Sequence, residues 1–182
     1  YKFFPYYKDN LEPSENDMMT WALVSSLLGF LMVMTGAWIF KDLVIRTFGT
    51  NSPEFLQYYK WVFPFAFGLT LFALLEAFAW QLKKSVLTNY LREVQFRLFT
   101  TVLIILFYWG VIKDFDLFIK VYAFTYIALA LILFSILFFK KDLNFTFSIS
   151  RVTRKFYKKI LTLISLIWGG NLVFTISNVF DS

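Results

Sequence analysis

Apolar residues occur in this sequence in blocks of about twenty, separated by short stretches that carry most of the charges. The blocks cover residues 18–40, 58–82, 94–112, 115–139 and 156–180. An α-helix rises about 1.5 Å per residue, so about twenty apolar residues match the roughly 30 Å hydrocarbon core of a bilayer. The pattern predicts an all-α protein, a polytopic transmembrane helical bundle with about five spans in this chain.

Aromatic residues mark the ends of the first two blocks. Trp21 and Trp38 lie near the ends of the first block, and Tyr58 and Trp80 bracket the second. Indole and phenol rings favour the membrane interface, because their apolar bodies and polar tips meet different surroundings there. The third block departs from the pattern, since Arg97 falls one turn into it.

The charges between the blocks predict an orientation. The loops after the second and fourth blocks are rich in Lys and Arg, whereas those after the first and third mix few basic residues with acidic ones. Cytoplasmic loops carry the excess of basic residues, so residues 1–17, 83–93 and 140–159 are predicted to be cytoplasmic. The basic residues predicted at the membrane surface are Lys83, Lys84, Arg151, Arg154, Lys155, Lys158 and Lys159.

Residues 140–159 also show helical periodicity. Basic residues recur on one face, while Val152, Phe156 and Ile160 fall on another. This indicates a basic amphipathic helix lying on the anionic inner leaflet. The alternative is that the charges only anchor the orientation of the neighbouring spans.

Composition narrows the classes of function. Hydrophobic residues make up 59% of the chain, and cysteine and histidine are both absent. Disulfides, thiolate nucleophiles, histidine acid–base chemistry and the commonest zinc sites are therefore excluded. No phosphate-binding glycine loop, paired catalytic carboxylates or serine nucleophile motif is found. We expect no enzyme, no catalytic residue, no cofactor and no metal, and we assign the net charge of +6 to topology and not to nucleic-acid binding.

Glu76 is the most informative single residue, because a carboxylate inside an apolar helix is costly unless it faces a cavity or a partner. One interpretation places it in a solvated transport cavity, where it binds a cation or substrate group or exchanges a proton. The other is structural: an ion pair with Arg92 or Arg97 of the neighbouring helix, or a carboxylate that extends to the inner membrane interface. Asn171 and Asn178 share a helix face, either of a cavity or of a helix seam. The candidate cavity residues are Glu76, Arg92, Arg97, Asn171, Asn178 and Asp181.

Three stretches carry a family resemblance. They are the leading Lys2-Phe3-Phe4-Pro5-Tyr6-Tyr7, the basic segment from Leu82 to Glu93, and the connection through Arg154-Lys155-Phe156 into a helix closing on Asn178-Val179-Phe180-Asp181. With them, the chain resembles the polysaccharide-exporter and O-antigen flippase branch of the multidrug/oligosaccharidyl-lipid/polysaccharide flippase superfamily. The resemblance covers about helices three to seven of that fold.

The resemblance implies a domain layout. Residues 1–139 would form the later part of the N-terminal six-helix half, residues 140–159 the cytoplasmic linker, and residues 160–182 the first helix of the C-terminal half. The remaining helices would belong to the same, longer chain. We therefore expect a fragment of a larger two-half protein.

It also implies a function: transfer of lipid-linked oligosaccharide or polysaccharide precursors across the bacterial inner membrane by alternating access. The partners would be membrane lipid and the lipid-linked glycan, and cavity cations would meet the pyrophosphate and sugar head group. The alternatives are a multidrug or cation antiporter of the same superfamily that uses Glu76, a membrane-integral glycan-modifying enzyme, and a non-catalytic membrane scaffold.

Overall fold

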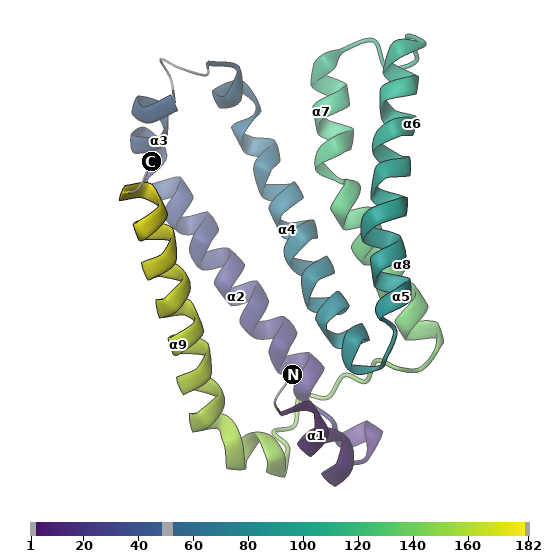
Figure 1. Cartoon of the computed structure of the whole chain (residues 1–182), viewed down its shortest axis with the longest axis vertical. Coiled ribbons are helices and arrows are strands. Elements are labelled where there is room, and N and C mark those ends of the chain that lie inside the picture. The colour runs from purple at the N-terminus through teal and green to yellow at the C-terminus, as the bar shows by residue number, and fades with distance from the viewer. Residues whose placement is uncertain (1–2, 49–52, 181–182) are drawn as a thin grey trace. The chain divides into compact units, whose positions relative to one another are not determined.

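The computed structural model describes residues 3–48 and 53–180, and all regular structure in this part of the chain is helical (Figure 1). This agrees with the predicted all-α class. The contacts divide the chain into two compact units. The first contains residues 19–143, and the second contains residues 3–18 and 144–180 of the described chain.

Most helices belong to the first unit. They are α2 (Met18–Ile39), α3 (Lys41–Phe48), α4 (Pro53–Gln81), α5 (Ser85–Asn89), a π-helical segment η2 (Tyr90–Gln95), α6 (Phe96–Tyr108), α7 (Phe115–Ala123) and α8 (Thr125–Phe139). In the view of Figure 1, α4 lies between α2 and the group formed by α6, α7 and α8. The second unit is built from α1 (Phe4–Asn10), a 3₁₀ turn η1 (Pro13–Glu15) and α9 (Arg151–Phe180).

The core of the first unit lies between α4 and α8, which make the most extensive helix–helix contact of the described chain. Side chains at helical spacing on each helix meet there: Phe72, Leu75 and Ala79 from α4, and Leu129, Leu133 and Leu137 from α8. One glycine sets the approach of the two helices. A Cβ atom added to Gly68 would lie 2.4 Å from the backbone nitrogen of Ile127, so only glycine fits there.

Three helical stretches are long and apolar enough to cross a membrane: Pro13–Ile39, Leu56–Gln81 and Phe115–Phe139. They coincide with the first, second and fourth predicted spans. The number of five spans is not established. Helical residues 85–108 contain the third predicted span as far as Tyr108, and Arg92, Glu93 and Arg97 lie near the middle of this helical stretch. The fifth predicted span lies within α9, and both of these spans remain predictions.

The regular helix is interrupted at Phe124, where α7 ends and α8 begins. No proline is present at this point. The hydroxyl of Thr125 donates a hydrogen bond to the carbonyl oxygen of Tyr122, three residues earlier. Such a bond competes with the hydrogen bonds of the helix backbone.

Two of the predicted basic loop residues end α4. Lys83 takes a left-handed conformation (φ 60°), and the amide of Lys84 donates to the carbonyl oxygen of Ala79 at 2.9 Å. This is the geometry of a Schellman helix end. The ammonium group of Lys84 then pairs with Asp142, just beyond the end of α8. Lys84 therefore joins the ends of two packed helices, which is a structural role that the charge pattern alone did not show.

In the second unit, a buried carboxylate holds the start of α9. Asp17 is fully buried and accepts hydrogen bonds from the Ser150 amide and the Thr153 hydroxyl, both at 2.9 Å. Ser150 itself caps the helix, because its Oγ accepts a bond from the Thr153 amide at 3.1 Å. The negative charge of Asp17 at a helix N-terminus is favourable. The pattern Asn16-Asp17 predicts a cap on the following helix. Asn16 does accept a bond from the Met18 amide, but Asp17 serves α9.

The predicted amphipathic helix is corrected in two respects. It begins at Arg151, because residues 141–150 form turns and irregular chain and only the later part is helical. Its apolar face is also not free for lipid at every position. The Phe156 ring lies 5.6 Å from the Phe3 ring and 5.0 Å from the Tyr6 ring, and Val152 is buried. Within this unit α1 covers part of the face that the sequence assigned to the membrane surface.

Tyr7 offers a pH-dependent test of this packing. Burial raises the pKa of the Tyr7 hydroxyl above 10.0, and the nearby Asp17 carboxylate adds to that effect, while the hydrogen bond with Thr153 opposes it. The folded state thus holds the proton more tightly than the unfolded state. The stabilisation is complete below pH 10 and is lost as the pH rises through the folded-state value.

We therefore expect Tyr7 to ionise above the value of a free tyrosine. A difference titration of tyrosinate absorbance between the native protein and Tyr7→Phe isolates this group. A Tyr7 component that titrates at the free-tyrosine value would contradict the packing of α1 on α9.

Candidate functional site

The candidate site is built around Glu76, which lies on α4 in the stripe that faces α8. Only 8% of the surface of the whole Glu76 residue, backbone included, is exposed. The apolar residues one turn to either side, Phe72 and Ala79, are buried in the core, so the helix carries the carboxylate into the protein with them. A carboxylate in such surroundings needs a charged or hydrogen-bonding partner.

Arg92 provides that partner. Its Nη1 lies 3.2 Å from Glu76 Oε1 and 3.3 Å from Oε2, and it donates a hydrogen bond to Oε2. Oε1 is buried, and among the described residues none donates a hydrogen bond to it. The sequence offered this ion pair as one of two interpretations of Glu76, and the structure shows the pair. Glu76 Oε1 therefore has a charge contact with Arg92 but no hydrogen bond among the described residues.

The ion pair continues toward the surface. Arg92 Nε lies 3.4 Å from Glu93 Oε1, and Glu93 Oε2 lies 3.1 Å from Arg97 Nη2. The exposed fraction of the side chains rises from 11% at Glu76 through 40% at Arg92 to 78% at Arg97. We call these four residues, Glu76, Arg92, Glu93 and Arg97, the charge chain. It leads from the core of the helix bundle to its surface with alternating sign.

Local helix geometry places the middle of the charge chain. Arg92 and Glu93 lie on the π-helical segment η2, where the Phe96 amide donates to the carbonyl oxygen of Leu91, five residues earlier. π-helical turns inside α-helices are rare and occur frequently at functional sites. Leu91 is buried in the core, which orients the segment toward α4.

Aromatic rings fill the space beside the charge chain. The Tyr126 ring on α8 stacks on Phe96 with centroids 4.8 Å apart, and it meets Phe65 edge-on at 5.1 Å and Phe72 at 6.1 Å. These rings exclude water from the deep end of the charge chain. Electrostatic interactions between its members are stronger there than at an exposed position.

The arrangement leaves part of the Arg92 side chain open to solvent. Arg92 is held from two sides by carboxylates, yet its side chain is 40% exposed. Arginine binds phosphate and carboxylate oxygens through a planar fork of donors. Two carboxylates that fix this fork reduce the ordering cost of binding.

Two of the other predicted cavity residues belong to the second unit. Asn171 lies exposed on α9. Asn178 lies on the same helix, and its side chain is not described. Asp181 falls outside the described residues. Whether these residues share a cavity with Glu76 stays a prediction.

The predicted basic surface residues of α9 are exposed. Arg151, Arg154, Lys155, Lys158 and Lys159 all lie in the first turns of the helix. The ammonium groups of Lys155 and Lys159 lie 5.6 Å and 5.9 Å from the centre of the Phe156 ring. Their exposure suits contact with anionic lipid head groups, which stays a prediction.

Sequence reasoning missed one member of the charge chain, Glu93. Its position four residues before Arg97 is the spacing of a helical ion pair, and that spacing was visible in the sequence. No group of three or more Asp, Glu, His or Cys residues suitable for a metal ion is present in residues 3–48 and 53–180.

The class of protein follows from the helices and the site together. The described chain is helical, three of its stretches have the length and composition of membrane spans, and a charge chain is enclosed among apolar helices. These are features of a helical membrane protein. Comparisons with protein-family models, with curated proteins and with solved structures find no match.

Proposed function

We propose that the chain is part of a flippase, a membrane transporter that moves lipid-linked oligosaccharide or polysaccharide precursors across the bacterial inner membrane by alternating access. The observation that carries the proposal is the Arg92 side chain, which is partly exposed and whose guanidinium group is held by Glu76 and Glu93. The head group of such a precursor carries a pyrophosphate, which matches the fork of an arginine. The loop charges and the resemblance of the sequence support the same reading.

Arg97 adds a second cation at the exposed end of the charge chain. Because it is 78% exposed and paired only with Glu93 among the described residues, it is free to contact an anion arriving from the surface. In the proposed cycle Arg97 receives the head group and Arg92 holds it. The Glu76 carboxylate holds Arg92 in its orientation.

The test is transport by the intact protein in proteoliposomes that contain a lipid-linked oligosaccharide diphosphate. Replacing Arg92 by Gln removes the fork, and we expect transport to fall about ten- to a hundred-fold, the range for losing charge-assisted hydrogen bonds. Lys113→Gln removes one positive charge at an exposed position away from the charge chain, and it should transport normally. Equal rates for native protein and Arg92→Gln, with both correctly folded, would overturn the proposal.

A cation antiporter of the same superfamily is the second candidate. It is favoured by the Glu76 Oε1 atom, which is buried, lies 3.2 Å from Arg92 Nη1 and accepts no hydrogen bond from a residue that the structure describes. The same vesicles distinguish the two candidates. A coupling role predicts that Glu76→Gln abolishes the dependence of export on an ion gradient. A flippase without ion coupling keeps the same rate with and without a gradient.

A further inference from the structure

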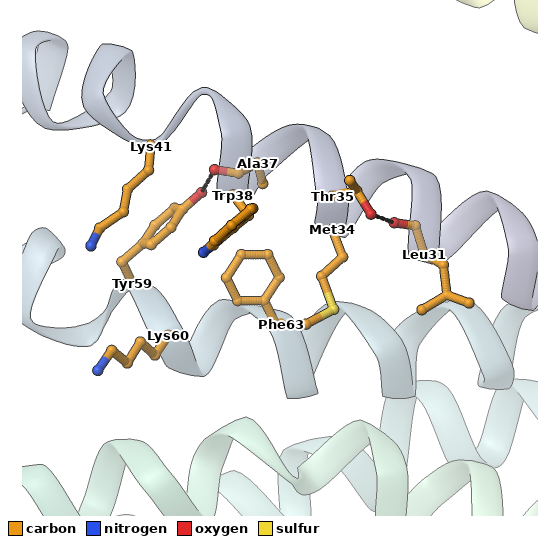
Figure 2. A pocket seen from close by; sticks show the side chains of 9 residues that line it. All are labelled: Leu31, Met34, Thr35, Ala37, Trp38, Lys41, Tyr59, Lys60 and Phe63. Atoms are coloured by element: carbon orange, nitrogen blue, oxygen red, sulfur yellow. Dashed lines mark hydrogen bonds between the residues drawn. The ribbon is translucent and has the colours of Figure 1, made fainter.

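A groove between α2 and α4 is separate from the charge chain. It encloses a cavity of about 600 Å³, within the range of small-molecule sites. Figure 2 shows its lining, contributed by one face of α2 together with Lys41 of α3 and by the first turns of α4. The lining residues are Leu31, Met34, Thr35, Ala37, Trp38, Lys41, Tyr59, Lys60 and Phe63.

The two helices touch only at limited points around the groove. The Tyr59 hydroxyl donates to the Ala37 carbonyl oxygen at 3.4 Å, and the Phe30 and Phe67 rings lie 5.2 Å apart. Between these contacts the apolar side chains remain uncovered. Leu31 is 54% exposed and Trp38 is 76% exposed. The groove therefore presents apolar surface that the described chain does not fill.

Its charge is confined to one end. Lys41 and Lys60 come from opposite walls, and Figure 2 shows both ammonium groups at the same end of the groove. Neither lysine forms an ion pair with a residue that the structure describes. Two cations without an ion-pair partner among the described residues, at one end of an apolar groove, complement a ligand with an anionic head and an apolar tail.

The length of the groove fits one leaflet of a bilayer. Leu31 and Lys41 are ten residues apart, which corresponds to roughly 15 Å along a helix. Half of the roughly 30 Å hydrocarbon core is the same length. With the lysines at the interface, where long basic side chains extend toward head groups, the far end lies near the bilayer centre. A protein helix filling the groove would have no need of the two cations.

We propose that this groove binds one anionic phospholipid of the surrounding membrane. An acyl chain lies along Leu31, Met34 and Phe63, and the phosphate lies between the ammonium groups of Lys41 and Lys60. The lipid is a bound constituent of the protein and not the transported substrate. The inference is independent of the proposed function, because it uses no residue of the charge chain.

The test uses Trp38 as a reporter inside the groove. The intact protein is reconstituted in phosphatidylcholine vesicles with a small fraction of phosphatidylglycerol brominated on its acyl chains, which quenches tryptophan on contact. The difference between native protein and Trp38→Phe isolates the Trp38 fluorescence. We expect brominated phosphatidylglycerol to quench it more strongly than brominated phosphatidylcholine at the same fraction.

Substitution of the lysines gives the decisive comparison. Lys41→Gln or Lys60→Gln should weaken the preference for phosphatidylglycerol about five-fold, and the double variant about thirty-fold, from the usual contribution of one basic residue at an anionic membrane surface. Lys41→Arg with Lys60→Arg should retain it. The matched control, Lys113→Gln with Lys140→Gln, removes the same charge at exposed positions outside the groove.

Two outcomes would overturn the inference. One is equal quenching of Trp38 by the two brominated lipids, which would mean that the groove is filled by protein or by any lipid alike. The other is an equal loss of preference in the groove variants and in the control, which would assign the effect to overall charge. Retained unfolding midpoints in all variants show that the proteins are folded.

Discussion

Gly68→Ala should lower the free energy of unfolding by about 3 kcal/mol, the upper part of the range for forcing atoms into a packed core. The added methyl group would lie 2.4 Å from the backbone nitrogen of Ile127 and 2.7 Å from the carbonyl carbon of Tyr126. Both atoms belong to the backbone of α8, so no side-chain rotation relieves the clash. The helices must separate, and the α4–α8 core separates with them.

Gly29→Ala on α2 is the matched control. Nothing lies within 4 Å of a Cβ at Gly29, and alanine favours a helix over glycine by about 1 kcal/mol. We expect this variant to equal or slightly exceed the native protein. Unfolding by denaturing detergent in mixed micelles, followed by circular dichroism, measures both. If the two alanine variants are equally stable, α4 and α8 do not approach as closely as described.

The second large effect is expected at the deep end of the charge chain. Arg92→Met leaves the Glu76 carboxylate buried without its cation. Breaking a buried pair costs about 3 to 5 kcal/mol, and we expect about 2 to 3 kcal/mol here, because Arg92 is 40% exposed. The same unfolding measurement applies. The loss should be recovered in part by Glu76→Gln in the same chain, since the double variant buries no unpaired charge.

Arg97→Met is the control for this pair. Arg97 is 78% exposed, and Glu93, its ion-pair partner among the described residues, is exposed as well; exposed ion pairs contribute roughly 0 to 1 kcal/mol. A double-mutant cycle over Glu76 and Arg92 gives their interaction energy directly. An Arg92→Met variant as stable as Arg97→Met would show that Glu76 is stabilised by something other than Arg92.

The two stability tests and the transport test separate folding from function. If Arg92→Gln fails in transport while it stays folded, Arg92 acts on the substrate. If it unfolds, the double variant with Glu76→Gln restores the fold without restoring the guanidinium. Transport by that double variant would contradict a role for Arg92 in binding the head group.

The sequence alone predicts the helical class and the three stretches able to cross a membrane, because a block of about twenty apolar residues has few other physical explanations. It also singled out Glu76, since a charge in an apolar helix is exceptional in any context. For Glu76, the sequence leaves pairing with Arg92 open as one interpretation beside a transport cavity. Residues sixteen positions apart meet only if the intervening turn folds α4 and η2 side by side, and the left-handed Lys83 that ends α4 sets that geometry.

The Asp17 contact, the start of α9 and the groove between α2 and α4 become visible only in the three-dimensional structure. Asp17 looks like a cap for the helix that follows it, but it accepts from Ser150 and Thr153, more than 130 residues later, and no local pattern encodes such a contact. The start of α9 at Arg151 depends on that same carboxylate. Likewise, the groove depends on how α2 and α4 lie beside each other, which the sequence of neither helix specifies. Apolar periodicity tells which residues avoid water, but not whether protein or lipid covers them.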